Sequence, residues 1–227
     1  MSRQKILLSW SSGKDAAWAL HTLRVAGTPP AGLLTTVNEA FGRVAMHAVR
    51  EELLEAQAAA AGLPLMKVRI PYPCPNEAYE TAMAAACAAA VSEGFTHVAF
   101  GDLFLEDVRD YRIEKLAGTG LDPLFPLWGR PTPELAREMI AGGLQARLTC
   151  VDPRVLDASF VGRAFDGKLL ADLPPGVDPC GERGEFHSFC HAGPMFDHPI
   201  AIEAGEVVTR DGFTFADLLL AGAGRNR

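Results

Sequence analysis

The residues best suited to chemistry in this chain lie in a short polar segment near its N-terminus. Residues 9–15 read SWSSGKD and combine hydroxyls, a glycine, a lysine and an aspartate. Apolar residues 6–8 precede the segment and residues 16–20 (AAWAL) follow it, so it stands where a strand should turn into a helix. A glycine lets the backbone approach an anion, the amides of the first helical turn point at that anion, and a lysine neutralises its charge. The segment therefore predicts a phosphate-binding site.

Two common phosphate-binding loops do not match this segment. A Walker A loop needs a glycine where Leu8 stands and Ser or Thr where Asp15 stands, and a Rossmann glycine fingerprint is also absent. Residues 11–15 instead resemble the PP-loop, S-G-G-x-D-S, of ATP pyrophosphatases, which split ATP into AMP and pyrophosphate. Ser12 replaces the first glycine, and Ala16 replaces the closing serine. The resemblance implies ATP and magnesium as cofactors, held by Ser9, Ser11, Ser12, Gly13, Lys14 and Asp15.

A second polar segment, residues 101–114, directly follows the apolar residues 97–100. Gly101 and Asp102 begin it, and Asp102 could coordinate nucleotide-bound magnesium or contact a ribose. Two arginines follow on a predicted helix, three residues apart, and could hold a carboxylate or phosphate with paired hydrogen bonds. A solvated, salt-bridged helix face explains the same charges. The candidate substrate-binding residues are Glu106, Arg109, Arg112 and Glu114.

A third polar segment, residues 178–189, reads DPCGERGEFHSF. Its glycines favour a binding loop over a core element. Glu182 or Glu185 could orient an amine, and His187 could move a proton near neutral pH. A zinc site is the alternative, although the spacing of its possible ligands matches no zinc pattern. Those ligands would be Cys180, His187, Cys190 and His191.

The first half of the chain alternates between strand-like and helical patterns. Apolar runs predict strands at residues 5–9, 32–37, 65–70 and 97–100, and helical spacing predicts helices at 15–24, 48–61 and 77–93. The alanine-rich third helix is expected to be nearly buried. Such alternation predicts right-handed βαβ units and a parallel sheet, whose ligands bind beyond the carboxyl ends of the strands.

The second half differs in texture and is rich in proline near its start. We expect a helix over residues 132–141, a strand over 144–151, and short strands over 200–202 and 207–209. Asp211 and Gly212 then predict a hairpin turn. The fold class is therefore α/β, with a parallel-sheet nucleotide-binding domain (residues 1–120), a smaller α+β substrate domain (residues 121–227) and a cleft between them.

Composition restricts the class of protein. The chain has 227 residues, of which 48% are hydrophobic, and its formal charge is −7. An acidic chain without a basic tail argues against a nucleic-acid partner. Five cysteines without a C-x-x-C pair suggest neither a disulfide framework nor a zinc ribbon. No apolar run reaches the roughly 18 residues of a membrane span, and the N-terminus lacks a secretory pattern, so we expect a cytoplasmic protein with no membrane partner.

The three polar segments together resemble the diphthine–ammonia ligase family of ATP-binding proteins. They are SSGKD, GDLFLEDVRDYRIEKL and GERGEFHSF, and they occur in this order along the chain. The resemblance implies a HUP-type (Rossmann-like) domain that activates a carboxylate as an acyl-adenylate for attack by ammonia. The acid, a small molecule or a protein, would face Glu182, Glu185 and His187. The nucleotide would be flanked by Met46, His47, Gly101 and Asp102.

Two other functions stay open at this stage. Other PP-loop proteins modify tRNA, a reaction that favours a basic surface and often uses a pair of cysteines; Cys150 and Cys180 are the candidates here. A regulatory module that holds ATP or AMP without turnover is the other, and Ala16 leaves room for it. The residue usage, typical of a GC-rich bacterial genome, favours a bacterial member acting on a different acid. The oligomeric state is undetermined, with a homodimer among the options.

Overall fold

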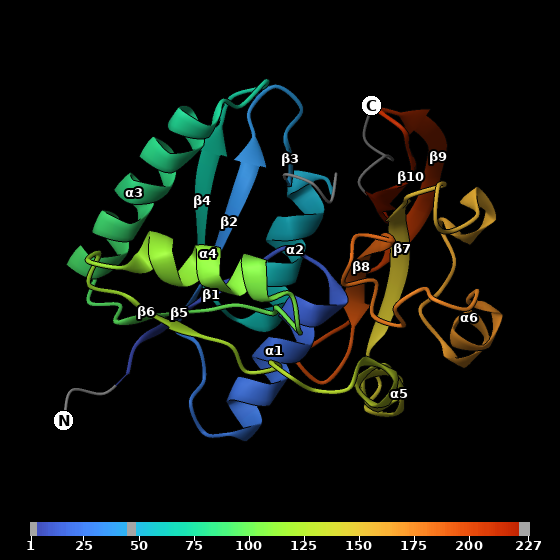
Figure 1. Cartoon of the computed structure of the whole chain (residues 1–227), viewed down its shortest axis with the longest axis horizontal. Helices are drawn as coiled ribbons and strands as arrows, with labels where there is room; N and C mark the ends of the chain where they lie inside the picture. The colour runs from blue at the N-terminus through green and yellow to red at the C-terminus, as the bar shows by residue number, and fades with distance from the viewer. Residues whose placement is uncertain (1–3, 45–48, 223–227) are drawn as a thin grey trace.

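The computed structural model describes residues 4–44 and 49–222 of the chain, which form two sheets with helices packed around them (Figure 1). Sheet A contains β1 (Ile6–Ser9), β2 (Gly32–Asn38), β3 (Arg43–Val44), β4 (Leu65–Ile70), β5 (His97–Ala99) and β6 (Asp122–Leu124). Its helices are α1 (Lys14–Val25), α2 (Glu51–Ala61), α3 (Asn76–Ser92) and α4 (Glu106–Leu116). In this part of the chain no helix has the length and apolar character needed to cross a bilayer.

Sheet A has the strand order of a Rossmann-like fold. Strand β1 is central and pairs in parallel with β2 on one side and β5 on the other. Strand β4 extends the sheet beyond β2, and β6 extends it beyond β5, both in parallel register. The strand order therefore reverses at β1, and ligands bind at such a switch point in open α/β sheets. The segments that follow β1 and β5, residues 9–15 and 101–105, meet there.

The two faces of sheet A are covered by different helices because side chains alternate along each strand. On β1, Ile6 and Leu8 join a buried cluster with α1 and α2, whereas Leu7 points to the opposite cluster with α3 and α4. Helix α3 contradicts the expectation of near-complete burial: only Ala86, Cys87 and Ala90 are buried. It covers an outer face of the sheet, so one stripe of its alanines packs and the others are exposed.

The second half forms sheet B, an antiparallel sheet in the order β8-β7-β10-β9. Its strands are β7 (Gln145–Val151), β8 (Phe186–Ala192), β9 (Ile202–Arg210) and β10 (Phe213–Leu220). Helix α5 (Thr132–Ala141), the short helix η1 (Ala158–Phe160) and α6 (Gly167–Asp172) surround it. The predicted hairpin is confirmed, because Asp211 and Gly212 both have positive φ, as a tight two-residue turn requires.

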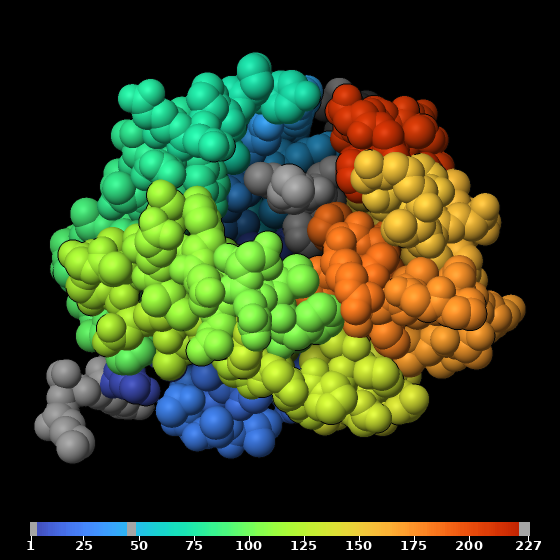
Figure 2. Space-filling view, in the orientation of Figure 1, coloured from blue at the N-terminus to red at the C-terminus, as the bar shows by residue number. Residues whose placement is uncertain are grey.

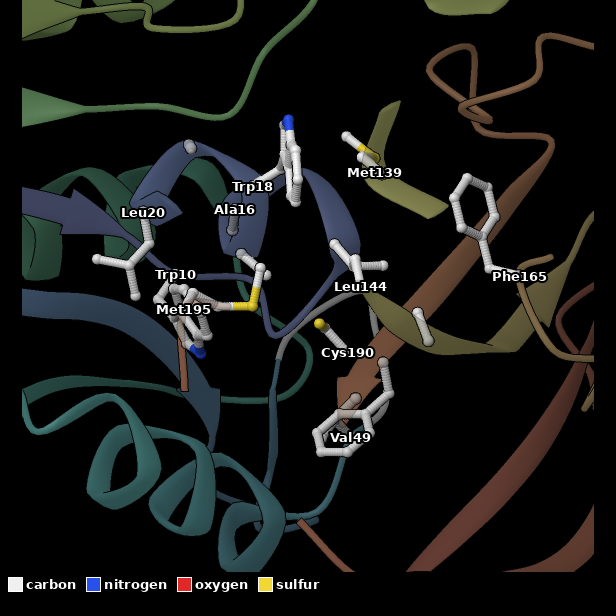
Figure 3. Close-up of a cluster of buried hydrophobic side chains, with 14 of the residues drawn as sticks. Trp10, Ala16, Trp18, Leu20, Val49, Met139, Leu144, Phe165, Cys190 and Met195 are labelled. Atoms are coloured by element: carbon white, nitrogen blue, oxygen red, sulfur yellow. The ribbon is translucent and has the colours of Figure 1, made fainter. Parts of the chain in front are cut away.

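One hydrophobic core runs from sheet A to sheet B. Figure 3 shows its centre, where Trp18 of α1 lies near Met139 of α5 and Leu20, farther along α1, lies near Trp10. Because α1 is packed between the sheets, the phosphate-loop segment at its N-terminus lies at the junction of the two halves.

Three strands escaped the sequence patterns, among them the two-residue β3. Strand β6 contains Pro123, which a parallel sheet tolerates at its edge because no partner needs the missing amide. Strand β8 begins inside the segment that reads as a loop, so His187 stands on a strand of sheet B. The segment's histidine and serine obscured the pattern, although most of the strand is buried.

Candidate functional site

A cavity of about 200 Å³, here named the loop cavity, lies where the three polar segments meet. The loop after β1, the segment after β5 and the start of β8 each contribute to its wall. Its lining residues are Ser9, Ser11, Lys14, Asp15, Ala16, Phe100, Gly101, Asp102, Arg112, Gly181, Glu182, Gly184, Phe186, His187 and Ser188. The structure thus brings together residues from all three segments, which are far apart in the sequence.

The loop after β1 is fixed from several sides. Gly13 precedes α1 in extended backbone, and the amide of Lys14 donates to Ser188 Oγ at 3.2 Å. The first-turn amides of Asp15 and Ala16 belong to residues that line the cavity, and an anion there would meet them together with the positive end of the helix dipole. Ser12 is fully buried in the left-handed region, with φ of 71°, and its carbonyl accepts from the amide of Cys190 at 2.9 Å.

Lys14 is buried and ties the two halves together. Its Nζ donates to Asp15 Oδ2 at 2.9 Å and to the carbonyl oxygen of Cys180. Burial disfavours the ammonium form, but the charges of Asp15 and Glu182 offset this, so the pKa of Lys14 lies above its ordinary value. Lys14 is therefore a permanent positive charge at the wall of the loop cavity.

Gly101 and Asp102 close the cavity at the end of β5. A Cβ on Gly101 would come within 3.0 Å of the backbone of Asp15 and Ala16, so glycine is what permits this approach to α1. The carboxylate of Asp102 accepts two hydrogen bonds from Arg112, one of them from Nη2 at 3.0 Å. Arg112 also lies over the ring of Phe100, 4.4 Å from its centroid. The pair presents a fixed guanidinium edge to the cavity.

The loop before β8 is organised by two buried carboxylates. Glu185 accepts from the amides of Asp178 and Arg183, each at 2.9 Å. Asp178 accepts from the amide of Cys180 at 2.8 Å and from Thr132 Oγ1 at 2.6 Å, which anchors the loop to the start of α5. Glu185 is absent from the lining of the loop cavity. Its geometry is that of a residue that shapes the loop rather than one that faces a substrate.

Glu182 and His187 face the loop cavity with perturbed acidities. Burial raises the pKa of Glu182 to about 7, and the nearby charges of Asp15 and Asp102 add to the effect; the amide of Leu103 (2.7 Å) and Lys14 oppose it. Burial lowers the pKa of His187 to about 4, and the charge of Lys14 contributes. His187 is therefore neutral at pH 7, contrary to the expectation of titration near neutrality, and Glu182 is the better proton acceptor there.

The remaining candidates lie elsewhere. Arg109 lies over Trp128, 4.8 Å from the ring centroid, and is absent from the cavity's lining. Glu106 and Glu114 are exposed on α4 and also absent from that lining. Met46 and His47 fall outside the described residues. Among the described residues, no three His, Cys, Asp or Glu side chains gather as a metal site, including the four candidate zinc ligands.

Gln57 is a central residue that the sequence patterns did not single out. It is fully buried on α2, donates to the carbonyls of Ser12 (3.0 Å) and Cys190 (2.6 Å), and accepts from Trp10 Nε1 at 2.9 Å. A glutamine that interrupts an alanine-rich helix was the available signal. Gln57 holds the loop after β1 against β8.

A second cavity of about 230 Å³, here named the strand cavity, adjoins the loop cavity above the carboxyl ends of β1 and β2. The two share Ser9, Ser11, Phe100 and Arg112. Its wall is mostly apolar and includes Leu34, Val44, Met83, Val98 and Leu116. The shared wall makes one continuous site with a polar end and an apolar end.

Known proteins resemble part of the chain. The model of the family described as diphthamide synthase C-terminal domain matches residues 132–217, which contain sheet B. The diphthine–ammonia ligase of Homo sapiens is 34% identical over 118 residues, which is 49% of this chain and 44% of that protein. That of Danio rerio is 36% identical over 125 residues, 49% of this chain and 46% of that protein.

The chain thus spans less than half the length of the curated relatives it matches. The family matched, the relatives' names and the order of the three polar segments agree with one another. The chain is similar to the diphthine–ammonia ligases over about half of its length.

Proposed function

We propose that this protein is an ATP-dependent ligase that joins ammonia to a carboxylate and releases AMP and pyrophosphate. The observation that carries the proposal is the loop cavity. The N-terminus of α1 and Lys14 meet there with Glu182, whose pKa lies near 7, at the switch point of a Rossmann-like sheet. The relatives named diphthine–ammonia ligase support the same reaction class.

The nucleotide would extend across the two adjoining cavities. The phosphates would lie in the loop cavity against the first turn of α1, and the nucleoside would lie in the apolar strand cavity. A buried oxygen at the loop cavity supports this fit: Asp15 Oδ1 has no hydrogen-bond partner among the described residues. Asp15 Oδ1 would hold the magnesium ion that neutralises the phosphates, and Arg112 would add positive charge beside them.

The chemistry proceeds in two balanced steps. An oxygen of the acid attacks the α phosphorus, pyrophosphate leaves, and the acid becomes an acyl-adenylate. Ammonia then attacks the acyl carbon, AMP leaves with the oxygen that attacked, and one proton is lost to give the amide. Glu182 would take the proton from ammonium, because a pKa near 7 lets its carboxylate accept a proton at neutral pH.

The cysteines bear on an alternative function, tRNA modification, and on the cellular compartment. A tRNA-modifying enzyme with a reactive cysteine pair is less well supported, since burial raises the pKa of Cys150 to about 12 and raises that of Cys180 further. All five cysteines are free thiols, as is typical of a cytoplasmic protein, and we place this protein in that compartment.

The products of ATP cleavage test the proposal. The purified protein is incubated with ATP, magnesium, ammonium and a pool of metabolite acids, and the nucleotides are separated. AMP and pyrophosphate that depend on ammonium and on the acid pool are expected. ADP as the product would contradict the proposal, and tight ATP binding without any turnover would instead indicate a regulatory module.

A further inference from the structure

A third cavity opens on the other side of His187. This aromatic cavity has a volume of about 310 Å³ and lies between the β2–β3 turn and sheet B. Figure 2 shows the recess between the teal and green elements on one side and the orange and red ones on the other. Its lining includes Phe41, Tyr72, Cys150, His187, Arg210 and Phe215. His187 is common to this cavity and the loop cavity.

The register of sheet B fixes one wall of the aromatic cavity. Phe215 on β10 stands opposite Cys150 on β7, and Cys150 stands opposite His187 on β8. The three side chains therefore form a row across neighbouring strands on one face of the sheet. A molecule lying along this row has one end at His187, which also lines the loop cavity, its middle over Cys150 and its other end at Phe215.

Arginine side chains already cover two rings of this wall. The guanidinium of Arg210 lies 4.9 Å from the centroid of Phe215, and that of Arg154 lies 5.6 Å from the centroid of Phe213. A ring face that is already covered by a guanidinium group cannot also bind an ammonium ligand by a cation–π contact. The guanidinium groups instead provide positive charge that can bind an anion. Across the cavity Phe41 and Tyr72 meet edge to face at 4.9 Å and supply an apolar wall.

Two arginines line the end of the aromatic cavity away from His187, and they differ in their ion pairs. Arg43 is paired with Asp217 at 2.8 Å. Arg210 is exposed at the end of β9 and its guanidinium is held over Phe215, beside the hairpin residue Asp211. Arg210 is therefore the group that sets the sign of a ligand bound at this end.

We propose that the aromatic cavity binds the body of the acid that the ligase activates, an inference that rests on the proposed function. The acid is elongated: its reacting carboxyl lies beside His187, a flat apolar body lies over Cys150, and a second anionic group meets Arg210 above the ring of Phe215. Strands in a sheet lie about 4.8 Å apart, so two strand spacings set the two anionic groups on the order of 10 Å apart. The structure thus assigns a dianion with an apolar body as the substrate class.

Three probes of one shape test this assignment: biphenyl-4,4′-dicarboxylate, biphenyl-4-carboxylate and 4′-(trimethylammonio)biphenyl-4-carboxylate. Binding of each to the full chain is measured by calorimetry, with binding of ATP measured in parallel. We expect the diacid to bind about tenfold tighter than the monoacid, the size of one charge-assisted hydrogen bond, and the cationic probe to bind most weakly.

Variants separate the arginine from the apolar wall. Arg210→Gln should abolish the preference for the diacid, whereas Arg137→Gln, an exposed arginine on α5, should keep it. Phe41→Leu, in the apolar wall opposite Arg210, should weaken the diacid and the monoacid about equally, by about fivefold.

Three results would each contradict the assignment of the aromatic cavity as the acid-binding site. Equal or tighter binding of the cationic probe, a diacid preference that survives Arg210→Gln, or no binding of any probe beside intact ATP binding would overturn the assignment. None of these results would contradict the proposed ligase activity, whereas failure of the unaltered chain to bind ATP would contradict it.

Discussion

Replacing Glu182 with glutamine should change how the stability of this protein depends on pH. The carboxyl of Glu182 has a pKa of 4.5 in an ordinary setting and about 7 in the folded chain, chiefly because it is buried. The folded state therefore holds this proton more tightly than the unfolded state does. Glu182 contributes stability that is fully present below pH 4.5 and is lost as the pH rises through 7.

The size of this change in stability follows from how far the pKa of Glu182 is raised. Between pH 5 and pH 8 such a group would cost about 2.5 kcal/mol of unfolding free energy if it were wholly shielded. Glu182 is partly exposed, so solvent screening reduces this, and we expect about 2 kcal/mol. His187 acts in the opposite direction, since its pKa falls from 6.5 to about 4 and its contribution is lost as the pH falls through that window.

Urea titrations at pH 5, 6, 7 and 8 measure the effect. Because His187 is present in both proteins, subtracting wild type from Glu182→Gln leaves the contribution of Glu182 alone. The variant should gain about 2 kcal/mol relative to wild type between pH 5 and pH 8. Glu134→Gln is the matched control, since its carboxylate is exposed on α5 and should produce no such difference. Parallel pH profiles for wild type and Glu182→Gln would refute the reasoning.

Three further predictions concern the loop, its support and the thiols. Lys14→Ala should weaken ATP binding by about 1.5–3 kcal/mol, the scale of a charged hydrogen bond, and unchanged affinity by calorimetry in a folded variant would contradict its phosphate role. Gln57→Leu should lower the unfolding free energy by about 2–4 kcal/mol, because three buried polar partners lose their hydrogen bonds; a loss below about 1 kcal/mol in urea would count against its central position. Cys74 should react first with a thiol reagent, as read by mass spectrometry, since burial raises the pKa of Cys150 to about 12; prompt modification of Cys150 in the folded protein would show that its burial is wrong.

Much of the fold could be predicted because it follows local rules. Residues 6–8 and 97–99 are largely buried strands and residues 65–70 are strand β4, and the first two polar segments follow strands at the edge where parallel sheets bind ligands. The exposure of α3 could not be read in this way. Alanine fits a buried and an exposed helix face equally well, so only the packing of the whole sheet decides which residues are covered.

For the candidate site, too, the sequence predicts one part and not another. Its location follows from residue types near the ends of β1 and β5, but the roles of single carboxylates depend on contacts between distant segments. Glu182 meets the amide of Leu103, whereas Glu185 turns back to the amides of its own loop. The lowered pKa of His187 likewise depends on burial in sheet B and on Lys14. No spacing in the sequence carries this information.

The fate of a carboxylate oxygen tests the proposed ligase most directly. An acid that stimulates ammonium-dependent AMP release is labelled with oxygen-18 in both carboxylate oxygens, and the products are analysed by mass spectrometry. Adenylation places one labelled oxygen in AMP, because that oxygen forms the bridge to the α phosphorus, and leaves the other in the amide. One oxygen-18 per AMP is the predicted result. Unlabelled AMP formed together with the amide, or label found in inorganic phosphate beside ADP, would contradict the account.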